Sequence, residues 1–180
     1  MNPTFAILAA AGVLSACSMG PMTPGSSKVD NAALPEAVRV PAGQTMRMVA
    51  TGVGEITYEC REKAAAAGQY EWAFVGPVAT LYSADKRNVG KYYAGPTWEA
   101  SDGSKVTGKQ LAVSPAAPGN IPMQLVKTDP AMGSGAMTGV TYIQRLNTKG
   151  GVAPGAPCDA TSKGRRQQVA YEADYAFYGA

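Results

Sequence analysis

The C-terminal segment of the chain, residues 167–178, places an apolar or aromatic side chain at every second position. A period of two is typical of a β-strand with one buried face, because successive side chains point to opposite sides of a sheet. The chain also holds 21 Gly and 13 Pro among its 180 residues, which favours many turns over long helices. We therefore predict an all-β fold. The residues that share the buried face of this segment are Val169, Tyr171, Ala173, Tyr175 and Phe177.

Further strand candidates follow one another at short spacing, separated by Gly, Pro and Asp-Gly turn signals. Together with the C-terminal segment they make about ten short strands, which indicates a single-domain β-sandwich or barrel. The alanine-rich run 62–68 is at most two turns of helix or a loop insertion. The other candidates are residues 44–50, 54–60, 70–75, 79–82, 89–93, 97–100, 105–113, 123–128 and 140–147.

The N-terminus has the pattern of an export signal. Residues 5–16 are uncharged and largely apolar, and at this length they are too short to span a bilayer. The stretch ends in Leu-Ser-Ala-Cys at residues 14–17, which resembles the lipobox of bacterial lipoprotein precursors. We predict a lipoprotein signal peptide over 1–16, a lipid-modified Cys17, a flexible tether over 17–33 and the all-β domain over 34–180. The alternative is a simple secretory signal with a free Cys17.

A lipid on Cys17 would make the membrane the partner of this chain and would place it on the cell envelope. Ser18 follows the cysteine where an acidic residue would act as a retention signal in a Gram-negative host. We therefore expect an exported, lipid-anchored protein on the outer membrane, facing the periplasm or the cell surface.

The two remaining cysteines, Cys60 and Cys158, form an even pair in an oxidising compartment, so we predict a disulfide between them. Such a bridge closes a loop of about 100 residues, worth roughly 4–5 kcal/mol in the chain-entropy model. The chain has no Cys-x-x-Cys motif, and we therefore predict a structural staple rather than a redox site.

Composition excludes several classes of function. The sequence contains no histidine, which excludes Ser-His-Asp and Cys-His catalysis and His-ligated zinc. The net charge is only +3 and the basic residues are scattered, so we predict no nucleic-acid partner. The glycine run 133–139 leads into a strand rather than a helix, which leaves a pyrophosphate without a binding site. We predict no cofactor and no metal.

Several segments occur in a characteristic order: Tyr-Glu-Cys at 58–60, then residues 91–99, 102–106, 140–154 and 173–178. Together they resemble an exported domain-of-unknown-function family, family 3455, which is found in bacteria and fungi. The resemblance covers roughly residues 34–178. It implies no function and assigns no catalytic residue.

Two positions depart from the pattern of that family. A histidine commonly precedes its Tyr-Ala-Gly-Pro-Thr-Trp segment, where this chain has Tyr92. The Ile-Pro-Trp segment of the family appears here as Ile121-Pro122-Met123. If the histidine supplies chemistry in relatives, this chain lacks it.

The polar residues nearest to a candidate site are Glu99 and Asp102, beside Trp98 and a tight turn; with Tyr142 they form a predicted ligand rim. Acid–base catalysis by Glu99 and Asp102 would require that one of the two carboxyl groups has a raised pKa. Tyr142 and Arg145 are an odd number of residues apart, so alternation sends them to opposite faces of one strand. We expect Arg145 to pair with Glu99 or Asp174, and we predict no catalytic residue.

Three functional hypotheses follow from these patterns. The leading one is a non-catalytic envelope module, binding or structural, that acts through its β-surface loops. The second is an envelope enzyme that uses carboxylate or tyrosine chemistry near Trp98 and Glu99. The third is a weak copper binder, because Met46 and Met48 are expected on one strand face and thioethers bind Cu(I). Core packing is the alternative use of these methionines.

Overall fold

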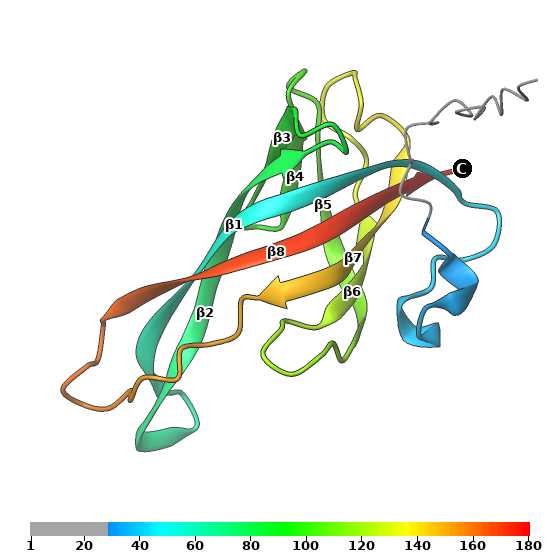
Figure 1. Ribbon diagram of the computed structural model, residues 1–180. Coiled ribbons are helices and arrows are strands. Elements are labelled where there is room, and N and C mark those ends of the chain that lie inside the picture. Colours follow the sequence, from blue (N-terminus) through cyan, green and yellow to red (C-terminus); the bar gives the residue numbers. More distant parts are fainter. Residues whose placement is uncertain (1–28) are drawn as a thin grey trace, which may run out of the picture.

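Eight antiparallel strands close into a barrel in which each strand pairs with the next along the chain and β8 returns to β1 (Figure 1). The computed structural model describes residues 29–180, so the predicted signal peptide 1–16 and the predicted lipidation site Cys17 lie outside the described residues. Two short 3-10 helices, η1 (Asn31–Ala33) and η2 (Glu36–Val38), precede the barrel. The strands are β1 (Thr45–Lys63), β2 (Ala66–Tyr82), β3 (Asn88–Tyr93), β4 (Thr97–Ala100), β5 (Lys105–Ser114), β6 (Met123–Thr128), β7 (Val140–Gly150) and β8 (Arg166–Gly179).

The all-β prediction is confirmed, and the barrel is the form that the chain adopts. Eight strands replace the expected ten because β1 and β2 each join two predicted strands into one. Gly54 lets β1 continue where it approaches β2, since a Cβ there would lie 2.0 Å from the carbonyl oxygen of Val78. Pro77 pairs with Ile56 of β1 and stays inside β2, where β3 pairs with β2 only from Val78 onward, so the other edge of β2 has no neighbouring strand at the proline.

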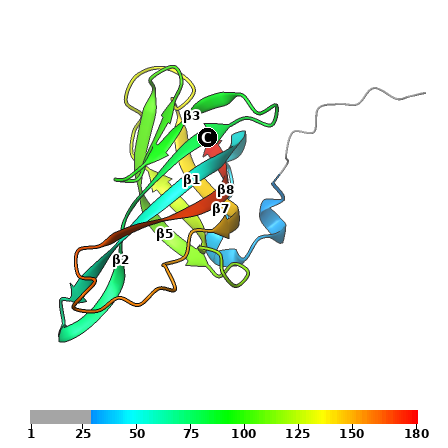
Figure 2. The ribbon, with the colours of Figure 1, turned by 60° about the vertical axis from the view of Figure 1, so that its left-hand side comes forward.

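The alanine-rich run 62–68 forms the tight connection of the β1–β2 hairpin rather than a helix. The far part of this hairpin projects beyond the barrel, and the loop between β7 and β8 runs beside it (Figures 1 and 2). The predicted disulfide is confirmed: Cys60 is bonded to Cys158, with an S–S distance of 2.05 Å. It ties this loop to the projecting hairpin.

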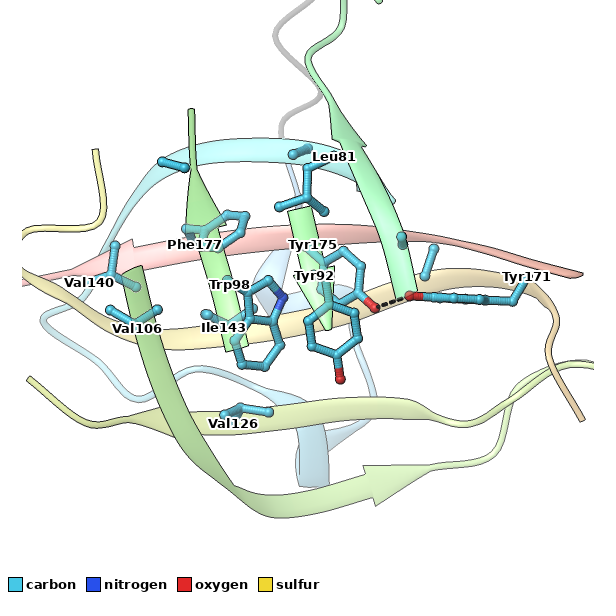
Figure 3. Close-up of a cluster of buried hydrophobic side chains, with 14 of the residues drawn as sticks. Leu81, Tyr92, Trp98, Val106, Val126, Val140, Ile143, Tyr171, Tyr175 and Phe177 are labelled. Carbon is cyan, nitrogen blue, oxygen red and sulfur yellow. Dashed lines mark hydrogen bonds between the residues drawn. The ribbon is translucent and has the colours of Figure 1, made fainter. Parts of the chain in front are cut away.

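The barrel interior is filled by one hydrophobic cluster that contains four of the five residues predicted to line the inner face of β8, with Val169 packed against it (Figure 3). Tyr175 and Phe177 are fully buried there. β8 pairs with β1 on one edge and with β7 on the other, which closes the barrel. One face of β8 is therefore turned to the barrel interior along its length, and this explains the alternation of apolar residues in the C-terminal segment.

A second cluster lies on the outside of the barrel, where the segment before β1 covers strands β6 to β8. Val38 and Val40 pack there against Leu125, Ala176 and Tyr178. Residues of the predicted tether take part: Val29 packs on this cluster and Asn31 exchanges hydrogen bonds of 2.9 Å with the backbone of Val40. The folded part of the chain thus already includes residues before 34.

Gln144 fastens this segment to the barrel wall. Its amide nitrogen donates to the carbonyl oxygen of Val38 at 2.6 Å and to Asn31 at 3.0 Å, and its oxygen accepts from the Tyr178 hydroxyl at 2.9 Å. A fully buried amide with all of these partners specifies one seating of the segment. Within residues 29–180, no helix is long and apolar enough to cross a bilayer.

Candidate functional site

The four residues of the predicted ligand rim do not meet in one cavity. Trp98 and Glu99 are consecutive on β4 and therefore point to opposite sides of the barrel wall. Trp98 is fully buried inside. Glu99 faces outward, where it accepts a hydrogen bond of 2.7 Å from the Tyr93 hydroxyl and pairs with Lys91 at 3.2 Å.

Asp102 and Tyr142 lie apart from that pair. Asp102 occupies the turn after β4, where its carboxylate accepts from Ser104 and, at 2.7 Å, from the backbone N–H of Ala136. Tyr142 packs in the outer cluster, with the Lys127 ammonium 4.1 Å from its ring centroid. The Asp102 carboxylate and the Tyr142 ring are therefore both engaged in contacts within the domain.

The carboxylates of this region are held in the ionised form. Hydrogen bonds from Tyr93 and Lys91 lower the pKa of Glu99, and hydrogen bonds from Ser104 and Ala136 lower that of Asp102. A general acid at neutral pH needs the opposite shift. Neither group is therefore prepared for proton donation.

A cavity of about 480 Å³ occurs elsewhere, at the end of the barrel where β3 turns into β4 and the chain enters β6. We call it the barrel-mouth cavity. Its walls are mostly apolar and aromatic, and Phe74 stands at the rim with 58% of its surface exposed. The lining residues are Ile56, Tyr58, Phe74, Val75, Pro77, Tyr92, Ala94, Gly95, Pro96, Gly108, Gln110, Ile121, Pro122, Gln124 and Arg145.

Arg145 is the one charged side chain among the described residues that line this cavity. It reaches the inside because it lies two positions after Ile143, a fully buried residue of the barrel core. Its Nε and Nη2 donate to the carbonyl oxygen of Pro122 at 3.1 and 2.9 Å. The predicted separation of Tyr142 and Arg145 onto opposite faces is confirmed.

Two further polar groups of the cavity come from tyrosines. The Tyr58 hydroxyl donates to the carbonyl oxygen of Gly151 at 2.8 Å. Burial raises the pKa of Tyr58 and of Tyr92, and the positive charge of Arg145 acts in the opposite direction on both. Because the net shift is upward, both phenols stay neutral at physiological pH.

The floor of the cavity is continuous with the core. Tyr92 stacks on Trp98 with ring centroids 4.7 Å apart, and Trp98 meets Tyr175 edge-on at 5.9 Å. The Tyr92 hydroxyl points away from the hydrogen bond of 3.2 Å between Tyr171 and Tyr175 (Figure 3). The segment around Gly95 therefore does two things: Gly95 and Pro96 line the cavity, and Trp98 fills the core below it.

The expected ion pair of Arg145 is not formed. Arg145 pairs with neither Glu99 nor Asp174; Asp174 instead accepts from Thr51 at 2.8 Å and from Asn147 at 2.8 Å. Inward alternation from Ile143 would have placed Arg145 inside the barrel, away from both outward carboxylates.

Met46 and Met48 do not share a face either. A bulge in the pairing of β1 with β8 falls between them, so Met46 packs in the outer cluster and Met48 against the barrel core. The paired thioether site is thus not formed. Among residues 29–180, no group of three or more His, Cys, Asp or Glu side chains is arranged to hold a metal ion.

The fold and the cavity define a small β-barrel domain with a pocket at one end of the barrel. Over residues 41–179 the chain matches the family described as a protein of unknown function (DUF3455), and it belongs to that family. This confirms the resemblance seen in its motifs. No curated protein and no solved structure matches the chain significantly.

Three of the five segments that carry the family resemblance line the barrel-mouth cavity. Tyr58 comes from the first of the five, Tyr92 and Pro96 from the second, and Arg145 from the fourth. Tyr92, where the family pattern is expected to have histidine, is among these lining residues. Ile121 and Pro122, from the segment expected to depart from that pattern, line the same cavity.

Proposed function

We propose that this domain is a non-catalytic binding module that holds a small, largely apolar molecule in the barrel-mouth cavity. The observation that carries the proposal is the cavity itself, about 480 Å³ of space walled by aromatic and aliphatic side chains with a few polar groups. Its size and lining match those of small-molecule sites in proteins, which commonly measure about 300–1,000 Å³.

Binding is favoured over catalysis by the chemistry of the cavity. The described lining residues include no carboxylate, no lysine, no cysteine and no serine or threonine. Its tyrosines have raised pKa values, so neither is prepared to act as a base at neutral pH. Apolar walls with few polar groups hold and orient a ligand without transferring protons.

The proposal extends to the cell envelope on the basis of the sequence. A lipid on Cys17 would anchor the barrel to the outer membrane and leave its cavity open to an exported ligand. Metabolic labelling with an alkyne fatty acid tests this part. Label on the wild-type chain that disappears in Cys17→Ser supports the anchor, and equal labelling of both chains contradicts it.

The binding function is tested with N-phenyl-1-naphthylamine, a neutral dye whose emission rises in apolar surroundings. We expect saturable binding to the folded domain. Ala94→Trp, at the exposed rim of the cavity, should block it, whereas Ala160→Trp, on the exposed β7–β8 loop outside the lining, should not. No binding by the wild type, or equal binding by both variants, would contradict the proposal.

A further inference from the structure

Arg145 is half-buried in the lining of an otherwise uncharged cavity, and hydrogen bonds hold its position. Two of its nitrogens, Nε and Nη2, converge on one acceptor, the carbonyl oxygen of Pro122. The segment that carries this carbonyl is itself fixed, since the Ile121 carbonyl accepts from the Thr148 hydroxyl at 2.6 Å and the Ile121 N–H donates to Gly150 at 2.9 Å. The guanidinium is therefore oriented before any ligand arrives.

This guanidinium has no negatively charged partner in the part of the chain that the structure describes. The ion pairs of residues 29–180 use other cations, and no carboxylate lines the cavity. The two tyrosines beside it, Tyr58 and Tyr92, remain neutral. A carbonyl oxygen satisfies hydrogen bonds of an arginine but does not balance its charge. Arg145 is half-buried, so solvent screens part of this charge, and a ligand that covers the guanidinium would have to supply the counter-charge.

Hydrogen-bond donors remain free next to that charge. Within residues 29–180, neither Nη1 of Arg145 nor the Tyr92 hydroxyl has a protein hydrogen-bond partner. Both atoms reach solvent, since Trp98 Nε1 is the one buried side-chain nitrogen or oxygen without a partner in that range. On the same side of the cavity, Gln124 Nε2 donates to Gln110 Oε1 at 2.6 Å, which leaves the amide N–H groups of Gln110 without a protein partner among residues 29–180. The uncommitted donors of the cavity thus include a guanidinium nitrogen, a neutral phenol and amide N–H groups, and the guanidinium is the charged one, suited to an anionic oxygen.

We infer that the ligand of the barrel-mouth cavity is an apolar molecule with a single carboxylate, whose charge is balanced by Arg145 and whose body lies against the apolar wall. This inference rests on the proposed binding function and adds the chemical class of the ligand. One arginine matches one negative charge, and the wall formed by Ile56, Phe74 and Pro96 matches an apolar body. A carboxylate is planar, as is the guanidinium, and accepts paired N–H bonds.

The test compares two probes of nearly the same shape, 2-naphthoate and 2-naphthol, by isothermal titration calorimetry near neutral pH. The first is then an anion and the second is neutral. We expect the wild type to bind naphthoate about tenfold or more tightly than naphthol, as expected when a hydrogen bond to a charged group is gained. Arg145→Gln should reduce the naphthoate affinity to that of naphthol.

Two further variants control this result. Arg165→Gln removes the same charge from an exposed loop side chain outside the cavity and should behave as the wild type. Arg145→Lys keeps the charge without the planar fork and should retain part of the preference; it also serves if Arg145→Gln does not fold. Equal wild-type affinity for the two probes would overturn the carboxylate inference while leaving the binding function intact. Failure of the wild type to bind either probe would overturn both.

Discussion

Tyr92 and Trp98 face each other across the β3–β4 pair, and their rings stack with centroids 4.7 Å apart. One side of this stack is the buried core, because Trp98 is fully enclosed. The other side is the floor of the barrel-mouth cavity, which Tyr92 lines. The position of Tyr92 at the cavity floor therefore depends on how Trp98 packs in the core.

Replacing Trp98 tests its part in the core. Trp98→Ala should lower the free energy of unfolding by about 3–5 kcal/mol, the range for removing a buried aromatic side chain. Trp98→Phe should cost less, because it also removes an indole N–H that has no hydrogen-bond partner among residues 29–180. Urea unfolding measures both, with the half-buried Trp72→Ala as a control of smaller effect. A Trp98→Phe loss equal to that of Trp98→Ala would contradict this account.

The disulfide between Cys60 and Cys158 should stabilise the domain through the loop that it closes. The two cysteines are separated by 98 positions. The chain-entropy model gives about 4–5 kcal/mol for a loop of this size. We expect the double variant Cys60→Ala, Cys158→Ala to lose stability on that scale in urea unfolding. If reduction of the wild-type protein leaves its unfolding midpoint unchanged, the bridge is not a structural staple.

Glu59 should titrate far below the ordinary pKa of a glutamate. Hydrogen bonds from Arg61 at 2.8 Å and Arg166 at 2.7 Å lower its pKa to about 2 from the ordinary value of 4.5. Because the folded-state value is the lower one, its contribution to stability is present above about pH 4.5 and is lost as the pH falls toward 2. Carbon-detected NMR titration of the Glu59 carboxyl group measures the folded-state midpoint directly.

Removing the arginine partners should move that midpoint in a known direction. Arg61→Gln and Arg166→Gln should each raise the pKa of Glu59. Arg39→Gln should not, because Arg39 hydrogen-bonds to the Leu34 carbonyl oxygen and does not contact Glu59. A wild-type midpoint at the ordinary value would show that the two exposed ion pairs do not persist in solution.

Gly54 is needed where β1 and β2 come together. A Cβ at this position would lie 2.0 Å from the carbonyl oxygen of Val78 and 2.5 Å from the Cα of Ala79, and backbone atoms cannot move aside as side chains do. Gly54→Ala should therefore destabilise the domain by about 1–3 kcal/mol, as overpacking commonly does. Gly155→Ala, where the added Cβ meets nothing within 4 Å, is the matched control. Equal unfolding midpoints for the two variants would argue against this close approach.

The fold was predictable where one physical rule acts alone. Alternation identified the inner face of β8, because a strand with one buried face has a strict period of two. Cysteine parity identified the bond between Cys60 and Cys158. The number of strands was harder to predict, since a proline such as Pro77 normally ends a strand. Pro77 is tolerated within β2 because β3 is too short to pair with it at that edge of the strand, and the length of β3 is not evident from the residues around Pro77.

The candidate site was less predictable, because it depends on closure of the barrel. Trp98 and Glu99 look like one rim in sequence, yet the barrel wall separates them. Arg145 lies inside because of its spacing from Ile143, but only the register of eight strands shows that a cavity remains around it. The bulge between Met46 and Met48 likewise inverts an alternation that the sequence suggests.

The most direct test of the binding site is an NMR titration of the isotope-labelled domain with 2-naphthoate. The account predicts shift changes at the Arg145 side-chain N–H groups and at the methyl groups of Ile56 and Ile121, which line the cavity. The amide of Gly68, near the start of β2 and outside the cavity lining, should not move. Shift changes confined to the outer surface, or none at Arg145, would contradict a carboxylate-binding cavity at the barrel mouth.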